Sequence, residues 1–137
     1  MADFKITDRT FAVLQKSLDL RQNQQQVIAA NVANADTPGY RARKLSFEED
    51  LQQAIAQPEP RIRQSHSKHF PIGNAGVSAV QGTLSQVPNK NPLGDGNSVS
   101  LDDEMFDLAE SQLLYEAGAQ MLKKKLTMLK YAASDGR

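Results

Sequence analysis

Residues 101–133 read LDDEMFDLAESQLLYEAGAQMLKKKLTMLKYAA, and this stretch decides the fold. Its apolar residues recur at alternating steps of four and three, the heptad pattern by which a helix packs lengthwise against another helix. Ser100 stands where it can cap the first turn, with Asp103 at the partner position of a capping box. Acidic residues follow at the start and lysines gather toward the end, as the helix dipole favours. The pattern predicts one long helix, with a seam formed by Leu101, Met105, Leu108, Gln112, Tyr115, Ala119, Leu122, Leu126, Leu129 and Ala133.

The other end of the chain carries a second, weaker heptad pattern. It predicts a helix from about Thr7 or Asp8 to about Asn34. The helix should stop there because Thr37-Pro38-Gly39-Tyr40 places Pro and Gly at the central positions of a type II turn, where Gly supplies the positive φ. Two helices with matching seams are expected to pair antiparallel, as the two ends of one hairpin. The seam positions of this helix are Phe11, Leu14, Leu18, Arg21, Gln25, Ile28 and Val32.

Both predicted helices also carry apolar residues on the side away from the seam, whereas a surface helix of a monomer shows one apolar stripe. Either the middle segment covers this second side, or neighbouring subunits do. We favour neighbouring subunits, because a helix over 101–133 would be about 50 Å long and a globule of this size would measure somewhat under about 40 Å. Contacts that do not close into a ring would give an open helical assembly. The second-side residues are Val13, Leu20 and Val27 in the first helix and Phe106, Leu113, Ala117, Met121 and Met128 in the second.

A short helix is predicted between the two long ones. Ser46-Phe47-Glu48-Glu49 has the form of a capping box, which marks a helix start. Phe47, Leu51 and Ile55 then recur every four residues until Pro58 ends the pattern. The segment is therefore expected to be amphipathic, with its apolar side on the core.

The rest of the middle segment gives weaker signals. The apolar pieces 77–80 and 84–87 are expected to form a small β-hairpin, and the remainder reads as extended loop. The predicted fold is thus mainly α, with residues 1–40 and 98–137 contributing the two helices of an antiparallel, coiled-coil-like hairpin. Residues 41–97 form the loop-rich middle segment with its short helix and small β element.

Composition narrows the classes of function. Sixteen basic residues balance sixteen acidic ones, so the chain lacks the basic surface that binding of nucleic acid requires. It has no cysteine, which excludes disulfides, thiolate metal sites and a cysteine nucleophile. The first residues lack the apolar core of a Sec-type signal peptide, and no apolar run approaches the roughly 18 residues of a membrane span. We expect a soluble chain of one domain.

The sequence offers little catalytic chemistry. His66 and His69 are the only histidines, and no carboxylate or third ligand near them completes a metal site. Residues 94–97 read GDGN, which lacks the alternating carboxylates of a calcium loop and fits a tight turn leading into the Ser100 cap. We therefore predict no catalytic, cofactor-binding or metal-ligating residue, no small-molecule substrate, and a protein that is not an enzyme.

The end of the first predicted helix carries a motif with a known likeness. Residues 29–40 read AANVANADTPGY, in which Asn31 and Asn34 stand three apart before the Thr37-Pro38-Gly39-Tyr40 turn. This resembles the signature of the bacterial flagellar basal-body rod and hook proteins. The short length and further matches resemble the proximal rod members of that family, across residues 1–60 and 92–133. Those matches include Ala35-Asp36, Arg41-Ala42-Arg43, Asp95-Gly96-Asn97, Leu101, Asp102, Glu104, Tyr115, Lys125-Leu126 and Leu129-Lys130.

The resemblance implies a structural subunit. Rod proteins of this family pack their terminal helices into a hollow shaft that crosses the periplasm and transmits torque for motility. They leave the cytoplasm through the flagellar type III export apparatus, which would explain an envelope protein without a Sec signal. The expected partners are copies of the chain, other rod proteins, and adaptor and export-gate components at the proximal end. A cytoplasmic helical adaptor or export chaperone is the alternative, although it would have no need of the Thr37-Pro38-Gly39-Tyr40 turn.

Two sets of motif residues remain open between readings. Asn31 and Asn34 are poor helix formers, so they either fix the register between subunits by polar contacts or help to end the helix. Phe47 and Leu51 resemble the short aromatic–aliphatic element by which rod and hook proteins engage the export gate. They would equally suit an ordinary helix that docks on the core, and since export precedes docking the two roles are compatible.

Overall fold

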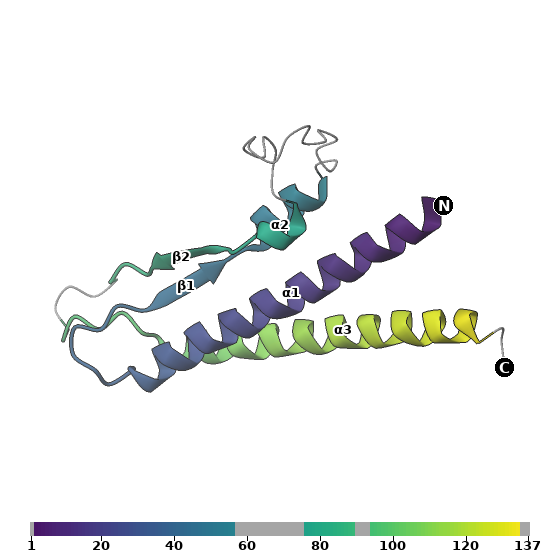
Figure 1. Cartoon of the computed structure of the whole chain (residues 1–137). Helices are drawn as coiled ribbons and strands as arrows, with labels where there is room; N and C mark the ends of the chain where they lie inside the picture. Colours follow the sequence, from purple (N-terminus) through teal and green to yellow (C-terminus); the bar gives the residue numbers. More distant parts are fainter. Residues whose placement is uncertain (1, 57–75, 90–93, 135–137) are drawn as a thin grey trace, which may run out of the picture.

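The computed structural model describes residues 2–56, 76–89 and 94–134, with the backbone alone for residues 2–8. Two long helices dominate it, α1 (Ala2–Ala33) and α3 (Leu101–Ala133). They run antiparallel and pack on each other, with both chain ends at the same end of the hairpin (Figure 1). Between them in sequence lie β1 (Arg43–Ser46), α2 (Glu48–Ala56), the 3₁₀ turn η1 (Val77–Ala79) and β2 (Thr83–Gln86). The mainly α hairpin with a small middle β element is thus confirmed.

The start of α3 follows the predicted cap. Ser100 has extended backbone, with φ −105° and ψ 108°, and its side chain accepts a hydrogen bond from the Asp103 backbone N–H at 3.4 Å. Three acidic residues occupy the first turn and Lys130 the last, which suits the partial charges of the helix ends. The helix begins and ends where its heptad pattern does.

The start of α1 lies earlier than predicted. The helix begins at Ala2 rather than Thr7 or Asp8, and the residues between contain no Gly or Pro that would stop it. Its end agrees with the sequence. Tyr40 N–H donates to the Thr37 carbonyl at 3.2 Å, and Gly39 has φ +72°, the left-handed conformation that the turn requires.

The middle segment forms an arm on the side of α1 away from α3 (Figure 1). Its core is Leu20 of α1, 1% exposed, packed with Leu45, Phe47 and Leu51 of the arm. Val27, Val77 and Val80 pack around this cluster, and the Arg21 guanidinium lies 5.4 Å from the centre of the Phe47 ring. For α1, the favoured interpretation was therefore wrong: the chain's own arm covers its second side.

The predicted hairpin between 77–80 and 84–87 is also wrong. β2 pairs antiparallel with β1, which places Leu45 opposite Leu84 and Ser46 opposite Thr83. Gly82, with φ +73°, lets the backbone pass close to β1; a Cβ there would lie only 3.1 Å from the Ser46 carbonyl oxygen. The piece 77–80 instead turns and contributes its two valines to the core.

The predicted capping box at Ser46 does not form either. Ser46 is the last residue of β1, and α2 begins at Glu48. The Glu48 carboxylate accepts from the Phe47 backbone N–H at 3.1 Å, while the Phe47 side chain enters the core. Strand pairing with Thr83 therefore takes the position that the local pattern assigned to a helix cap.

The helix pair uses a seam that differs in part from the predicted one. Leu108 and Leu122 are half-buried, but between them α3 buries Ser111 and Gly118 rather than Gln112 and Ala119. The small residues permit close approach: a Cβ on Gly118 would lie 3.2 Å from Leu18 Cδ2. Leu101, Met105, Leu126 and Leu129 remain exposed on the single chain.

Candidate functional site

Asn31, the first asparagine of the signature motif, joins three elements. It is 1% exposed. Its Nδ2 donates to the Arg43 carbonyl at 2.7 Å and to Glu104 Oε1 at 2.9 Å. Its Oδ1 accepts from the Arg43 backbone N–H at 3.0 Å and from the Tyr40 hydroxyl at 3.3 Å. The side chain thus ties the end of α1 to β1 and to the first turn of α3.

A contact between subunits was one of the two roles that the sequence left open for Asn31, and in the single chain its bonds are internal. A side-chain amide has two donor hydrogens and two acceptor lone pairs, and all four are used within the chain. A buried amide with a missing partner would cost about 1–3 kcal/mol, so the full set explains why a polar residue is tolerated here. Asn34 ends the helix: its Nδ2 donates to the Ala30 carbonyl at 2.8 Å, and its Oδ1 accepts from Thr37 Oγ1 at 3.3 Å.

Asn97, which the sequence offered only as part of a family match and a tight turn, has a structural role that was not predicted. Its Nδ2 lies 3.0 Å from the Asn34 carbonyl oxygen, 2.7 Å from that of Ala35 and 2.9 Å from that of Thr37. These carbonyls belong to the turn after α1, outside the regular hydrogen bonds of the helix, and a distant side chain donates to them here. Asn97 thereby ties the turn after α1 to the segment that leads into α3.

Residues 95–98 and 34–40 form one unit, which we call the clasp. Gly39 N–H donates to the Asp95 carbonyl at 2.9 Å, and Ser98 N–H donates to the Tyr40 carbonyl at 3.0 Å. Gly96, with φ +84°, lies so close that a Cβ on it would be 3.4 Å from the Gly39 Cα. The signature turn and the turn before α3 therefore fit together backbone to backbone, and the GDGN stretch does more than lead into the Ser100 cap.

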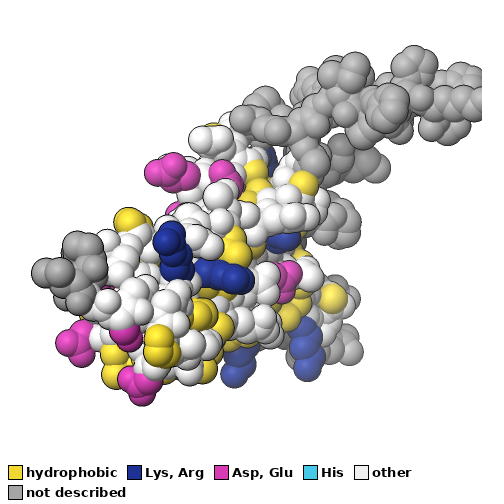
Figure 2. Space-filling view, turned by 90° about the vertical axis from the view of Figure 1, so that its left-hand side faces the viewer, with side chains coloured by type: hydrophobic (Ala, Val, Ile, Leu, Met, Phe, Trp, Pro, Cys, Tyr) yellow, Lys and Arg dark blue, Asp and Glu magenta, His cyan; other side chains and the backbone are white. Residues whose placement is uncertain are grey.

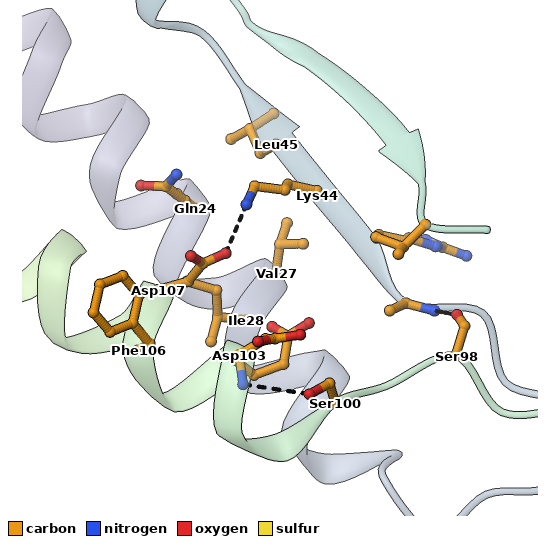
Figure 3. A pocket seen from close by; sticks show the side chains of 14 residues that line it. Gln24, Val27, Ile28, Lys44, Leu45, Ser98, Ser100, Asp103, Phe106 and Asp107 are labelled. Atoms are coloured by element: carbon orange, nitrogen blue, oxygen red, sulfur yellow. Dashed lines mark hydrogen bonds and ion pairs between the residues drawn. The ribbon is translucent and has the colours of Figure 1, made fainter. Parts of the chain in front are cut away.

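A groove of about 310 Å³ lies between α1, β1 and the start of α3 (Figure 3). Lys44 reaches across it from β1, with its Nζ 2.8 Å from Asp107 Oδ2 on α3. This hydrogen bond to Asp107 raises the pKa of the Lys44 ammonium, while burial raises the pKa of the Glu104 carboxyl. The Lys44–Asp107 ion pair links β1 to α3, and the Asn31–Glu104 hydrogen bond links α1 to α3. Neither contact provides a paired nucleophile and base.

The predicted packing residues of α1 and α3 separate into buried and exposed groups. On α1, Ile28 is buried, and Phe11, Leu14, Leu18 and Val32 are half-buried. On α3, Leu108, Ala119 and Leu122 are half-buried, and Tyr115 stands at the edge of exposure. The second side of α3 is open to solvent, with Phe106 71%, Leu113 68% and Met128 69% exposed. Figure 2 looks onto the end of the hairpin with the clasp, where hydrophobic side chains reach the surface between acidic ones.

The candidate export residues lie in the core. Phe47 is 2% and Leu51 8% exposed, so neither can be contacted from outside the folded chain. His66 and His69 fall outside the described residues. Within the described ranges, no group of three or more metal-ligating side chains comes together, and none of the helices has the length and hydropathy of a membrane span.

Comparison with known proteins gives one consistent result. A sequence profile described as "Flagella basal body rod protein" matches residues 13–41, which span much of α1 and the signature turn. The flagellar basal body rod protein FlgB of Salmonella typhimurium strain LT2 is 35% identical over 127 residues, which cover 87% of this chain and 91% of that protein. The FlgB proteins of Yersinia ruckeri and Escherichia coli K12 are 33% and 31% identical, with 79% and 87% of this chain covered and 81% and 88% of theirs.

Proposed function

The chain belongs to the FlgB family of flagellar basal body rod proteins, and from this premise we propose that it builds the proximal part of a hollow shaft. It is a structural subunit of the basal body rod and serves motility. In this proposal, α1 and α3 pack beside the helices of neighbouring subunits. The shaft crosses the periplasm and carries torque from the motor to the hook and filament.

One observation supports this assembly role above all others. Four large apolar side chains on the second side of α3, Phe106, Leu113, Met121 and Met128, are each more than half exposed. Each apolar side chain that becomes fully buried gains about 1.5–3 kcal/mol, so the exposed row is a strong drive toward association. A contiguous row of this kind on a soluble chain marks an interaction surface.

The partners follow from the family. Membership in the rod family implies assembly with other rod and basal-body proteins. We propose that these include copies of the chain itself, related rod proteins on the distal side, and adaptor and export-gate components at the proximal end. The clasp would hold α3 in a fixed orientation to α1, so that each subunit presents the same surface to its neighbours.

We further propose that the chain leaves the cytoplasm through the flagellar type III apparatus, with Phe47 and Leu51 as an export element. Both are buried in the folded chain, so the gate would read them only before the arm folds. The same two residues then pack on Leu20 after export, which reconciles the two roles that the sequence left open.

Secretion measures the export proposal. We expect Phe47→Ala and Leu51→Ala to reduce the amount of chain reaching the periplasm, in a strain without later rod components so that assembly does not interfere. Leu45→Ala is the matched control, because Leu45 lies in the same core but outside the element. Equal secretion of all three variants and wild type would leave core packing as the only role of Phe47 and Leu51.

Location tests the rod function against the less favoured alternative of a cytoplasmic adaptor or export chaperone. A rod subunit remains with hook–basal bodies through their purification, whereas a chaperone stays in the cytosol. We expect the chain in the purified basal bodies at a fixed ratio to other rod proteins. Recovery from the cytosol alone would refute the rod function. We propose no catalytic role, in keeping with the structural relatives.

A further inference from the structure

The exposed side of α3 contains a regular row, which we call the outer stripe. Beginning at Phe106, its positions follow one another at steps of four or three residues, so they lie along one line of the helix. Six of the eight are apolar, and all eight are exposed on the single chain. The outer stripe consists of Phe106, Glu110, Leu113, Ala117, Met121, Lys124, Met128 and Tyr131.

The two charged members of the outer stripe have opposite signs. Glu110 and Lys124 are 14 residues apart, which is two heptads, so they face the same direction. Each interrupts an otherwise apolar row. In a helix seam, one polar or charged position costs stability and selects the register in which it finds a partner.

Charges elsewhere on α3 are divided in the same way, with acidic residues toward its start and lysines toward its end. Residues 101–122 contain six acidic residues and no basic one, and residues 123–133 contain four lysines and no acidic residue. The helix dipole favours such charges only within the first and last turns. Glu110 lies nine residues after the start of α3 and Lys124 nine residues before its end, so the dipole does not account for either.

We propose that the outer stripe binds a second copy of this chain, with the two α3 helices parallel and offset by two heptads. The offset is about 21 Å along the helix axis. It places Lys124 of one copy beside Glu110 of the next, and off the stripe it brings Lys130 beside Glu116. The apolar positions then meet as well, since Phe106 and Leu113 of one copy come within one residue of Met121 and Met128 of the other.

Other pairings of the same surface satisfy the charges less well or do not extend. Two parallel copies without an offset would place Glu110 beside Glu110 and Lys124 beside Lys124, and like charges across an interface are repulsive. An antiparallel pair would match the charges but would close after two copies, with Ala117 opposite itself. The offset parallel pair leaves one Glu110 and one Lys124 open at its ends for other rod subunits; a third α3 cannot repeat the offset, because two offsets of about 21 Å fall short of the roughly 50 Å helix. This inference rests on the proposed rod function, for which an open assembly is needed.

Disulfide trapping distinguishes these pairings, because the chain has no cysteine of its own. Ala117 and Tyr131 lie on the outer stripe 14 residues apart, and their replacement leaves Glu110 and Lys124 in place. We expect a mixture of Ala117→Cys and Tyr131→Cys full-length chains, under mild oxidation, to form mainly the mixed disulfide. A dominant Ala117→Cys homodimer would overturn the proposal, since both the antiparallel and the unshifted pair predict it. Absence of any stripe disulfide at the highest soluble concentration would overturn it too.

A second pair of variants controls for the face of the helix. Gln112 and Leu126 are also exposed on α3 and 14 residues apart, but they lie off the outer stripe. We expect the mixture of Gln112→Cys and Leu126→Cys chains to form mixed disulfide at a several-fold lower yield. Equal yields from the two mixtures would contradict the assignment to the outer stripe.

Charge reversal tests the register independently of cysteine chemistry. Glu110→Lys and Lys124→Glu should each weaken self-association in sedimentation by roughly tenfold, because each turns an attraction into a repulsion. The double variant should restore it, while Asp19→Lys on α1 should change nothing. No recovery in the double variant would refute the pairing. The rod function has a separate readout, since a chain that still joins purified basal bodies with the pairing refuted remains a rod subunit.

Discussion

α1 and α3 have almost the same length, 32 and 33 residues, and both carry apolar residues on two sides. The chain covers the second side of α1 but leaves the second side of α3 exposed. The arm packs on the second side of α1, where Leu20 is buried with Phe47. The second side of α3 lies open, with Phe106 more than two-thirds exposed. The same sequence pattern therefore has two uses: in α1 it holds the subunit together, and in α3 it is available to other subunits.

The largest expected effect compares two phenylalanines. Phe47→Ala removes a side chain that is 2% exposed and should lower the free energy of unfolding by about 3–5 kcal/mol. Phe106→Ala removes an exposed one and should change it by less than about 0.5 kcal/mol. Urea unfolding of the dilute chain measures both. Similar losses for the two variants would mean that the outer stripe is buried within the monomer.

Asn31 gives the next largest effect, because it links both helices. Asn31→Ala leaves the Arg43 backbone groups and Glu104 without their partner in a buried place, which should cost about 2–3 kcal/mol. Asn23→Ala, at an exposed position of α1, is the control and should stay within about 0.5 kcal/mol. Thermal or urea unfolding would detect the difference, and a neutral Asn31→Ala would refute the linking role.

Asn97 should show a smaller loss, since water can reach part of the clasp. Asn97→Ala removes the donor to three carbonyls and should cost about 1–2 kcal/mol. Asn97→Asp should be worse than alanine, because a carboxylate placed against three carbonyl oxygens is repulsive. Amide exchange would locate the effect at residues 34–40. Unchanged protection there in both variants would show that the backbone bonds of the clasp suffice.

The smallest effect concerns the pH dependence of the contact between α1 and α3. Burial raises the pKa of Glu104 above its ordinary value of 4.5, so the folded chain holds this proton at a pH where the unfolded chain has lost it. Glu104 should therefore make stability fall slightly as pH rises from its ordinary pKa to the raised one. Glu104→Gln, which retains an acceptor for Asn31, should lose this slope. Parallel pH profiles for the two chains would contradict the assignment.

Local signals explain which parts of the fold could be predicted. Ser100 and the turn at residues 37–40 carry their structure within a few residues, so both ends of the hairpin loop were readable from sequence. The partner of β2 was not, because a four-residue apolar piece suits several neighbours and the choice depends on how Gly82 packs on Ser46. The bonds of Asn97 could not be predicted either, because their partners lie about 60 residues away in sequence and no periodic pattern marks them.

The heptad pattern also had a limit. It located α3 and its pairing with α1, but it could not tell whether Gln112 and Ala119 or Ser111 and Gly118 face the partner. Packing selects the smaller pair, since Leu18 needs the space that Gly118 leaves. Leu126 and Leu129, which the sequence placed in the seam, lie on the same face as Leu108 and Ser111 but are exposed, because α1 and α3 diverge toward the chain ends (Figure 1). Their predicted role in packing remains a proposal for the assembled rod.

The central claim is that the outer stripe of α3 serves assembly and not the fold of the single chain. Leu113→Asp tests it most directly, with Gln112→Asp, also exposed but one residue off the stripe, as the matched control. Both chains should unfold in urea like wild type, within about 0.5 kcal/mol. The variants are expressed in a strain that lacks the wild-type protein. We expect the Gln112→Asp chain to enter basal bodies and support swimming, and the Leu113→Asp chain to be absent from basal bodies. Basal bodies that contain Leu113→Asp at the wild-type ratio would contradict the account.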